Sequence, residues 1–312
     1  MTERAYKFGS HGGMVGILAE PDANDRRTGA PAVLFSNIGL NHRVGPNRLY
    51  VDLARRLAVA GYTSLRFDLS GFGDSDPRRD GGTDIERAVN DTREAMDFCE
   101  KRGIRQFVLV GLCSGVDSMY HTALQDRRVA GGVFIEGYAY RNAGFWLRYL
   151  TTRNLQPHRW LRFVRVRVAR LSGHPPMVDP NDDPDVFERG FPSREQFSAD
   201  LKALTDRGVR MLFVYTSNAD GCYNYRGQFH DAFGYHDAID VEYFNRADHV
   251  FSTEAYRNLL LERLVQWMEE QFPRSVRSSA DPLRSTLCLV APAMVSVGRL
   301  ITIAQDANLL AW

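Results

Sequence analysis

Short apolar runs alternate with helical patterns through the first 136 residues of the chain. This alternation is typical of a mostly parallel β-sheet whose two faces are covered by helices. We therefore predict an α/β fold of that kind. The apolar runs that indicate buried strands lie at residues 31–36, 63–67, 106–110, 131–135, 211–215 and 240–244.

Helices between these strands are indicated by apolar residues at helical spacing. Pro46 opens one such stretch and Gly61 ends it, as expected from the preference for proline at the start and glycine after the end of a helix. Thr83 and Glu86 have the spacing of a capping box at the start of the next long helix. Ser252 is the predicted N-cap of the last helix.

Two segments interrupt the pattern. Residues 138–198 separate the fifth and sixth predicted strands by much more than an ordinary loop, so we predict an inserted helical cap there. The cap divides a core made of residues 1–137 and 199–272. Residues 273–312 form a tail that starts polar and then becomes apolar, with no acidic residue between Asp281 and Asp306. This composition suggests peripheral contact with a membrane as a hypothesis.

The composition narrows the class of protein. The 312 residues are 44% hydrophobic and 25% charged, which excludes a disordered or low-complexity chain. Because 39 basic residues face 38 acidic ones, the net charge of +1 gives no general attraction for nucleic acid. The four cysteines lie far apart without metal-ligand spacing, so we expect no disulfide framework and no metal. The first residues lack a secretory signal pattern, and no segment reads as a membrane span, so a cytoplasmic location is predicted.

A G-x-C-x-G sequence follows the strand at 106–110 and precedes a helical run. Glycines two residues on either side of a nucleophile give the room that a sharp strand-to-helix turn needs, and such a turn exposes the central side chain. Cys113 is therefore the predicted nucleophile, and the alternative is a buried, inert thiol. Ser114 is the local rival, although we expect its backbone N–H to serve the oxyanion hole instead.

The sequence DLSGFGDS at residues 68–75 resembles the D-x-x-G-x-G-x-S loop of the α/β-hydrolase superfamily, and the resemblance spans about residues 11–272. It implies an α/β-hydrolase fold with a nucleophile, an acid and a histidine base in that chain order. Asp220 follows the strand at 211–215 and is the implied acid, with a simple turn carboxylate as the alternative. His249 is the implied base, whereas the adjacent Asp248 is expected to be structural.

The same resemblance implies a second oxyanion donor in the loop after the first clear strand. Leu40 N–H is the predicted donor, with Gly39 as the next choice. The run RVGPNR at residues 43–48, the cysteine elbow and the loop around His249 also resemble hydrolases associated with exosortase systems in bacterial exopolysaccharide clusters. Cysteine elbows occur as well in dienelactone hydrolases and polyhydroxyalkanoate synthases, which the motif alone resembles.

A cysteine paired with His249 can ionise to a thiolate, attack an acyl carbon and form a thioester. The predicted function is therefore hydrolysis of an ester or thioester without a metal or organic cofactor. An acyltransferase that uses the same intermediate is the alternative enzyme. A third reading is a non-catalytic binding protein on a hydrolase scaffold.

The predicted cap is basic and aromatic. Residues 141–170 contain eight arginines and no acidic residue. Its candidate substrate-binding residues are Arg141, Trp146, Arg148 and Trp160, which suit an anionic acyl carrier protein, a coenzyme A ester or another anionic acyl substrate. A solvated arginine face, balanced by the acidic residues of 179–188, is the alternative.

Overall fold

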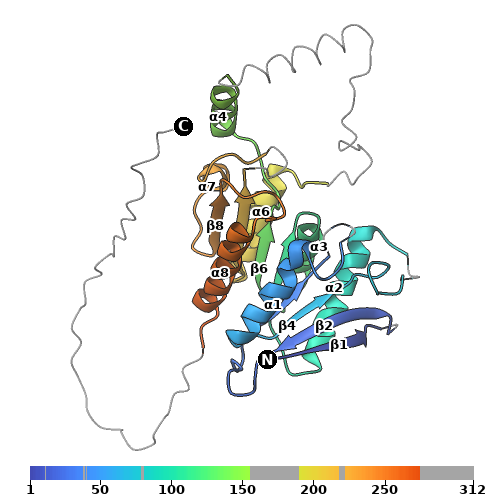
Figure 1. Ribbon diagram of the computed structural model, residues 1–312. Helices are drawn as coiled ribbons and strands as arrows, with labels where there is room; N and C mark the ends of the chain where they lie inside the picture. Colours follow the sequence, from blue (N-terminus) through green and yellow to red (C-terminus); the bar gives the residue numbers. More distant parts are fainter. Residues whose placement is uncertain are drawn as a thin grey trace, which may run out of the picture. The chain divides into compact units, whose positions relative to one another are not determined.

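The computed structural model describes residues 1–10, 12–37, 39, 41–78, 81–154, 190–217 and 222–274. Its strands are β1 (Thr2–Phe8), β2 (Met14–Glu20), β3 (Ala32–Phe35), β4 (Ser64–Phe67), β5 (Phe107–Leu112), β6 (Val129–Ile135), β7 (Arg210–Thr216) and β8 (Ile239–Phe244). They form one sheet in the order β1-β2-β4-β3-β5-β6-β7-β8 (Figure 1). All six predicted strands are confirmed.

The first two strands were missed by the sequence analysis. Strand β1 pairs antiparallel with β2, and β2 pairs antiparallel with β4, whereas β4 and the strands beyond it are parallel. Of the seven residues of β1, Phe8 alone is buried, so its sequence has no apolar run to reveal it. Strand β1 is thus held by its backbone pairing at the edge of the sheet.

The helices of the described part are η1 (Pro46–Arg48), α1 (Leu49–Val59), α2 (Asp84–Glu100), α3 (Gly115–Gln125), α4 (Ala143–Asn154), α6 (Arg194–Asp206), α7 (Gln228–Phe233) and α8 (Glu254–Gln271). The capping box of α2 is confirmed, because the Thr83 hydroxyl accepts from Glu86 N–H and the Glu86 carboxylate accepts from Thr83 N–H. The last helix has Thr253 rather than Ser252 as its N-cap. Ser252 is occupied elsewhere, since its N–H and hydroxyl both donate to Asp248.

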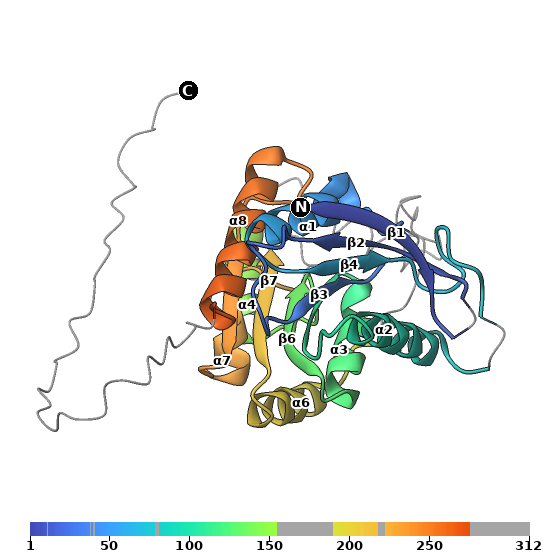
Figure 2. The same cartoon turned by 90° about the horizontal axis from the view of Figure 1, so that it is seen from below.

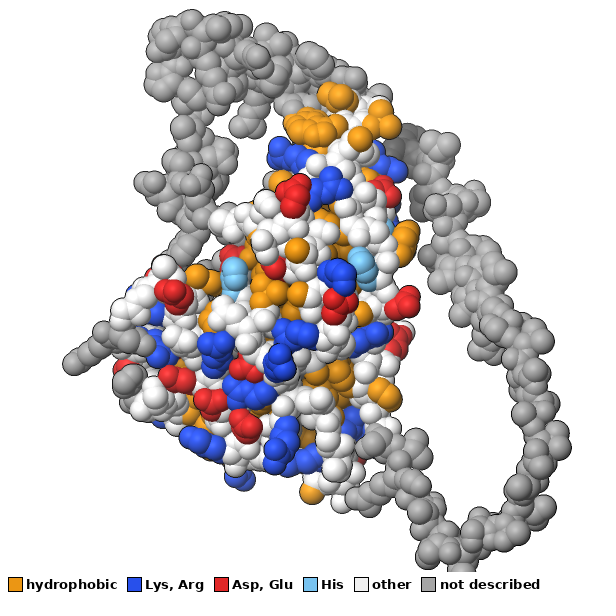
Figure 3. Space-filling model, turned by 180° about the vertical axis from the view of Figure 1, so that it is seen from behind, with side chains coloured by type: hydrophobic (Ala, Val, Ile, Leu, Met, Phe, Trp, Pro, Cys, Tyr) orange, Lys and Arg blue, Asp and Glu red, His pale blue; other side chains and the backbone are white. Residues whose placement is uncertain are grey.

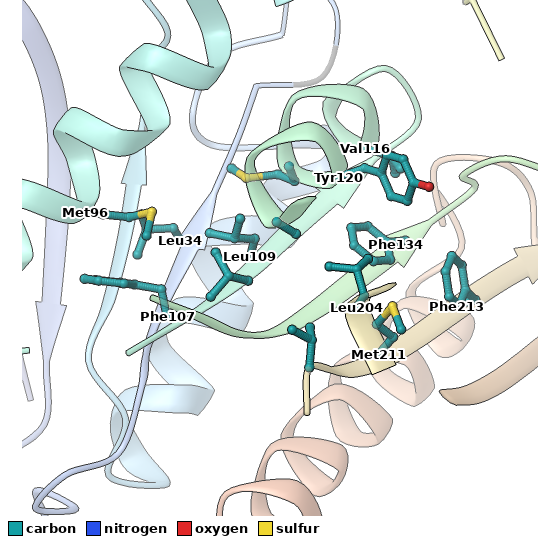
Figure 4. Packing of buried hydrophobic residues seen from close by; sticks show 14 of the residues in the cluster. Leu34, Met96, Phe107, Leu109, Val116, Tyr120, Phe134, Leu204, Met211 and Phe213 are labelled. Carbon is teal, nitrogen blue, oxygen red and sulfur yellow. The ribbon is translucent and has the colours of Figure 1, made fainter. Parts of the chain in front are cut away.

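Buried side chains alternate between the two faces of the parallel strands. Phe107 and Leu109 of β5 pack on the side of α2, α3 and α6, while Val108 and Val110 pack on the side of α1 and α8. Figure 2 shows these two helical layers on opposite sides of the sheet. Figure 4 shows the first face, where side chains of neighbouring strands such as Leu109 lie against α3. This three-layer arrangement confirms the predicted α/β architecture and leaves the carboxyl ends of the parallel strands to carry a site.

The predicted cap is described at its two ends. Helix α4 lies within it, and α6 begins at Arg194, where Phe197 and Leu201 already belong to the core beneath the sheet. Residues 155–189 of the cap and residues 275–312 of the tail lie outside the described residues. None of the helices in the described ranges is both long and apolar enough to cross a membrane.

Candidate active site

Cys113 lies at the sharp turn between β5 and α3. Its φ of 53° is in the left-handed region that residues other than glycine rarely adopt. A Cβ on Gly111 would lie 2.5 Å from the carbonyl oxygen of Gly115, and a Cβ on Gly115 would lie 2.5 Å from that of Asn37. Both glycines are therefore required by close backbone contacts. The predicted strand-turn-helix geometry is present, with the Cys113 side chain partly exposed.

The imidazole of His249 joins the elbow to a buried carboxylate. His249 lies in the loop between β8 and α8, and its Nδ1 is 3.0 Å from Oε2 of Glu136. The Cys113 thiol lies close enough to the same ring to raise the pKa of His249. Because Nδ1 faces the carboxylate, Nε2 is the nitrogen left for the thiol. This arrangement links a thiol, an imidazole and a carboxylate in series.

Glu136 directly follows β6 and is fixed from several sides. Its side chain is fully buried, and its φ is 53°. Its backbone N–H donates to the carbonyl of Val214, and its Oε1 accepts from the N–H of Thr216. One carboxylate oxygen is therefore held by β7, and the other is directed to the His249 ring.

The acid predicted at Asp220 lies outside the described residues, so that assignment stays a prediction. The contact that was assigned to Asp220 is made by Glu136, which the sequence analysis missed. One signal was available, because Glu136 is a single acidic residue directly after the apolar strand GGVFI. The chain order of nucleophile, acid and base also holds for Cys113, Glu136 and His249.

Asp248 is structural, as predicted. Its carboxylate accepts hydrogen bonds from the N–H groups of Val250 and Ser252 and from the Ser252 hydroxyl. Burial acts to raise the pKa of Asp248, but the hydrogen bonds from Ser252 and Val250 outweigh it and hold the pKa below its usual range. The ionised side chain thus shapes the loop that presents the neighbouring His249.

The surroundings of His249 favour its charged form. Hydrogen bonds with Cys113 and Glu136 raise the pKa of His249 to about 10, although burial acts in the opposite direction. Both partners attract a proton on the ring because each carries negative charge when ionised. The surroundings therefore favour the imidazolium form of His249 at neutral pH.

Two of the predicted oxyanion donors, Ser114 and Gly39, are among the described residues. Within the part of the chain that the structure describes, the Ser114 N–H at the start of α3 donates to no acceptor. The Gly39 N–H donates to the Ser114 hydroxyl at 2.7 Å, so this donor is already used in the structure. Leu40 lies outside the described residues. Ser114 thus places its backbone at the elbow and its hydroxyl against the loop that follows β3.

The loop after β4 holds the loop that follows β3 in place. Asp68 is fully buried and accepts from the Asn37 side-chain amide, from the Arg43 N–H and guanidinium, and from the Asp74 N–H. A Cβ on Gly73 would lie 2.4 Å from the Asp68 carboxylate, and the φ of Gly73 is 52°. The D-x-x-G-x-G-x-S sequence is therefore the scaffold of the loop that carries Gly39.

One group of potential metal ligands occurs among the described residues, namely His42, Asp68 and Asp74. The Arg43 guanidinium already forms ion pairs with both carboxylates. A metal ion at these atoms would have to displace that guanidinium. The group is accordingly an ion-pair network, and it gives no support to a metal site.

Comparison with known proteins bears on the fold. No family model matches the chain, and no curated protein matches it in sequence. Among solved structures, the α/β hydrolase GrgF from Penicillium sp. sh18 is similar with a TM-score of 0.52 and 17% identity, covering 87% of this chain and 98% of that one. The dienelactone hydrolase from Anabaena variabilis has a TM-score of 0.53 and 13% identity over 87% of this chain and 98% of its own. The chain has the α/β-hydrolase fold.

A third structure of this fold is a soluble variant of monoglyceride lipase from Saccharomyces cerevisiae. Its TM-score is 0.51 at 14% identity, and the match covers 87% of this chain and 97% of that one. At such low identities the likeness is one of fold. In this α/β-hydrolase fold, Cys113, Glu136 and His249 each lie directly after or a few residues beyond a parallel strand, at the same edge of the sheet.

A cavity of about 510 Å³ opens beside the elbow of the α/β-hydrolase fold. Gly39 and Ser114 lie at one side of it, and Leu69, Phe72 and Ile85 supply apolar walls from the loop after β4 and the start of α2. This volume is within the range of small-molecule sites. The cavity therefore lies against Ser114, the residue that follows Cys113.

The four candidate substrate-binding residues of the predicted cap differ in their surroundings. Arg141 packs over the rings of Phe145 and Trp146, at 5.4 and 5.5 Å from their centroids, so it stabilises α4. Trp146 is 46% exposed on α4, where Figure 3 shows hydrophobic side chains at the end of the described molecule with basic side chains below them. Arg148 lines a second cavity of about 450 Å³. Trp160 lies outside the described residues.

Proposed function

We propose that this protein hydrolyses an ester or thioester through an acyl intermediate on Cys113. The observation that carries the proposal is the series of contacts from the Cys113 thiol through the His249 imidazole to the buried Glu136 carboxylate. The named structures that share the fold include a dienelactone hydrolase and a monoglyceride lipase, which supports an ester substrate. In this proposal Glu136 takes the role that the sequence analysis gave to Asp220.

Acylation begins when the Cys113 thiolate attacks the carbonyl carbon of the substrate. The carbonyl π electrons move to its oxygen, and the Ser114 N–H donates to the resulting oxyanion, a contact worth about 3 kcal/mol in comparable sites. Collapse of the tetrahedral intermediate breaks the bond to the leaving group, which takes the proton from Nε2 of His249. Glu136 keeps the ring oriented through Nδ1.

Deacylation uses the same groups in reverse. His249, now neutral, removes a proton from water, whose oxygen attacks the thioester carbonyl carbon. The products are the carboxylic acid and the Cys113 thiolate beside the imidazolium. An amine or alcohol that replaces water would give acyl transfer, so the two reactions share every residue and differ in the acceptor.

The cavity beside the elbow is the proposed acyl site. Its apolar walls at Leu69, Phe72 and Ile85 lie next to Ser114, so an acyl chain attached to Cys113 can be removed from water there. The RVGPNR run that resembles the exosortase-associated hydrolases supports the catalytic loop, since the Asn47 side chain donates to the carbonyl of Val250. We extend the proposal to a cytoplasmic enzyme of exopolysaccharide metabolism whose acyl donor is a small molecule, a coenzyme A ester or an acyl carrier protein.

The proposal is tested by intact-mass spectrometry after brief mixing of the full chain with a panel of acyl thioesters and activated esters. We expect an acyl mass on Cys113 that disappears in Cys113→Ala. Cys99 is a matched control, because it is a fully buried thiol whose pKa burial raises to about 12, and Cys99→Ala should keep the adduct. Free acid and acylated amine are then quantified when an amine is supplied.

Three outcomes would change the assignment. An adduct on Ser114 would replace the nucleophile, and predominant acylated amine would make the protein an acyltransferase. No adduct and no turnover with any donor would favour the binding-protein reading. The proposal stands only if the adduct forms on Cys113 and free acid is the main product.

A further inference from the structure

Helix α4 is held to the rest of the described molecule through one of its faces. Phe145 is buried, and its ring stacks with that of Tyr149 at 5.7 Å between centroids. The carbonyl of Phe145 accepts a hydrogen bond from the Asn224 side chain, and its N–H donates to the Asn142 side chain. The Asn142 amide in turn donates to the Tyr225 hydroxyl. These contacts fix which face of α4 is turned toward the core.

A second face of α4 is apolar and exposed. Four residues have the spacing i, i+3, i+4 and i+7, which places side chains on one side of a helix, namely Ala143, Trp146, Leu147 and Leu150. The exposed fractions are 46% for Trp146, 65% for Leu147 and 55% for Leu150. We call these four residues the outer face of α4. Since Phe145 already packs against the core, the outer face is not needed to hold the helix in place.

This cluster of exposed apolar side chains stands out in the described part of the chain. Seven large hydrophobic residues are exposed there, and three of them belong to the outer face. The other four lie on four different segments, at Met1, Val59, Tyr235 and Leu259. Figure 3 shows hydrophobic side chains gathered at the end of the described molecule, with basic side chains next to them. Single exposed apolar residues are ordinary, whereas a contiguous group marks a surface for a partner.

The sequence around α4 carries concentrated positive charge. Between Glu136 and Asp179 there are eight arginines and no acidic residue. The rest of the chain has a net charge of −7, because 31 basic residues remain there against all 38 acidic ones. The segment that contains the outer face therefore has the opposite sign of charge from the remainder of the protein. Its partner is expected to be anionic.

A lipid surface fits this combination better than a protein does. The outer face has four residues of one helix, whereas a specific protein interface takes about 20 to 30 residues on each side. A bilayer surface needs no matching shape, and tryptophan and leucine are the side chains that enter its headgroup region. Arginines behind a helix about 10 Å wide still feel anionic headgroups, since the Debye length is about 8 Å at physiological ionic strength.

We propose that the outer face of α4 docks on the surface of an anionic lipid bilayer. Trp146, Leu147 and Leu150 enter the headgroup region, and the arginines of residues 141–170 supply the attraction to lipid phosphates. The 12 residues of α4 form a helix about 18 Å long, which is too short to span a hydrocarbon core of about 30 Å, so the helix lies on the surface. The docking does not depend on the proposed function, because no acyl donor takes part.

Co-sedimentation of the full chain with vesicles tests the docking and its charge preference. One set of vesicles is phosphatidylcholine alone, and the other is phosphatidylcholine mixed with phosphatidylglycerol. We expect the mixed vesicles to bind at least about tenfold more tightly at low salt, with a smaller ratio as salt is added. Equal binding to both kinds of vesicle would mean that the arginines are balanced by the acidic residues of 179–188, and it would overturn the proposal.

Variants locate the contact. The double variant Leu147→Ser with Leu150→Ser should weaken binding to the mixed vesicles about tenfold or more. Val59→Ser and Leu259→Ser are matched controls, because they remove apolar side chains that are 75% and 51% exposed on α1 and α8, and they should bind as the parent does. Thermal unfolding of each variant confirms that it is folded. Equal binding by the parent and the double variant would overturn the assignment to α4.

Fluorescence quenching by mixed vesicles with brominated acyl chains reports direct contact. Trp146→Phe keeps an aromatic ring and should bind as the parent does, but it should show less quenching because the inserted fluorophore is gone. Unchanged quenching would show that Trp146 does not enter the lipid. Two further outcomes would also overturn the proposal. One is a dimer that the double variant dissociates, and the other is binding through the outer face to an acidic acyl carrier protein but to no vesicle.

Discussion

Asp68 and Glu136 both follow a parallel strand directly, and both are buried, but the groups that face them differ. Asp68 accepts hydrogen bonds from donors that keep their protons, which are two backbone N–H groups, an amide and the Arg43 guanidinium, and the His42 ring lies farther away, at 3.9 Å. Glu136 accepts from the backbone N–H of Thr216 through one oxygen, and its other oxygen faces the titratable ring of His249. A carboxylate saturated by groups that keep their protons stabilises a loop. A carboxylate that shares its proton partner with a reactive thiol can serve chemistry.

The largest effect on activity should come from neutralising the Glu136 carboxylate. In Glu136→Gln the amide cannot hold the His249 ring in the required tautomer, and kcat/KM should fall about 10³- to 10⁴-fold, as for the loss of the acid in comparable triads. Stopped-flow acylation of Cys113 measures this directly. Asp220→Asn is the matched control and should stay within about fivefold of the parent. A larger loss in Asp220→Asn than in Glu136→Gln would return the acid to Asp220.

Asp68→Asn should affect stability more than chemistry. The amide keeps the shape of the carboxylate but removes the buried charge partner of the Arg43 guanidinium, which keeps its ion pair with the exposed Asp74. Breaking one partner of a buried ion pair costs about 3 kcal/mol or more. Urea unfolding of the parent and the variant measures the difference. A loss below about 1 kcal/mol would mean that the donors around Asp68 do not depend on its charge.

The pKa of His249 should respond differently to the loss of Glu136 and to the loss of Asp68. The pKa of His249 is raised to about 10, above its ordinary value of about 6.5. Protonation of the ring therefore stabilises the fold fully below pH of about 6.5, and this contribution is lost as pH rises through about 10. Turnover of alkyl esters should fall as the pH rises through about 10, because the leaving group then loses the His249 imidazolium as its proton donor.

Glu136→Gln should lower the His249 pKa by about one unit or more, since an opposite charge within hydrogen-bond distance is removed. Asp68→Asn should leave it unchanged, because Asp68 is not among the groups that act on His249. Ring-proton chemical shifts of His249 measured between pH 5 and 11 by NMR decide the matter. Equal shifts in both variants would show that the two carboxylates do not differ as proposed.

Asp68 and Glu136 also show how much of the site could be predicted from the sequence. The six parallel strands and the glycine-flanked elbow were accessible because each depends on local spacing, and His249 was implied by the resemblance to α/β hydrolases. Glu136 was not, since its place opposite Cys113 depends on β6 lying beside β5 with Leu112 paired to Ile135. This register makes the residues that follow the two strands neighbours. A single sequence does not contain the strand order, so the acid was assigned by the order of the chain alone.

The loop that follows β3 and lies beside Cys113 also has a contact that could not be predicted from the sequence. Gly39 was the second choice, after Leu40, for the oxyanion donor that the resemblance implied, whereas its N–H donates to the Ser114 hydroxyl. That contact joins two segments 75 residues apart and has no local signature. Strand β1 was missed for a related reason, because pairing to β2 rather than an apolar pattern holds it.

The smallest effect is expected for Ser114→Ala. This variant tests whether the Ser114 hydroxyl, like Asp68, supports the loop that follows β3. Ser114→Ala keeps the backbone N–H at the elbow but removes the acceptor that holds Gly39, so the free energy of unfolding should fall by about 1 kcal/mol. Acylation of Cys113 should slow by less than about tenfold, since the Ser114 N–H still faces the oxyanion. Urea unfolding and intact-mass kinetics on the same variant measure both quantities. If Ser114→Ala loses acylation as completely as Cys113→Ala, the hydroxyl takes part in the reaction itself, and the division between supporting and reactive groups around the elbow has to be redrawn.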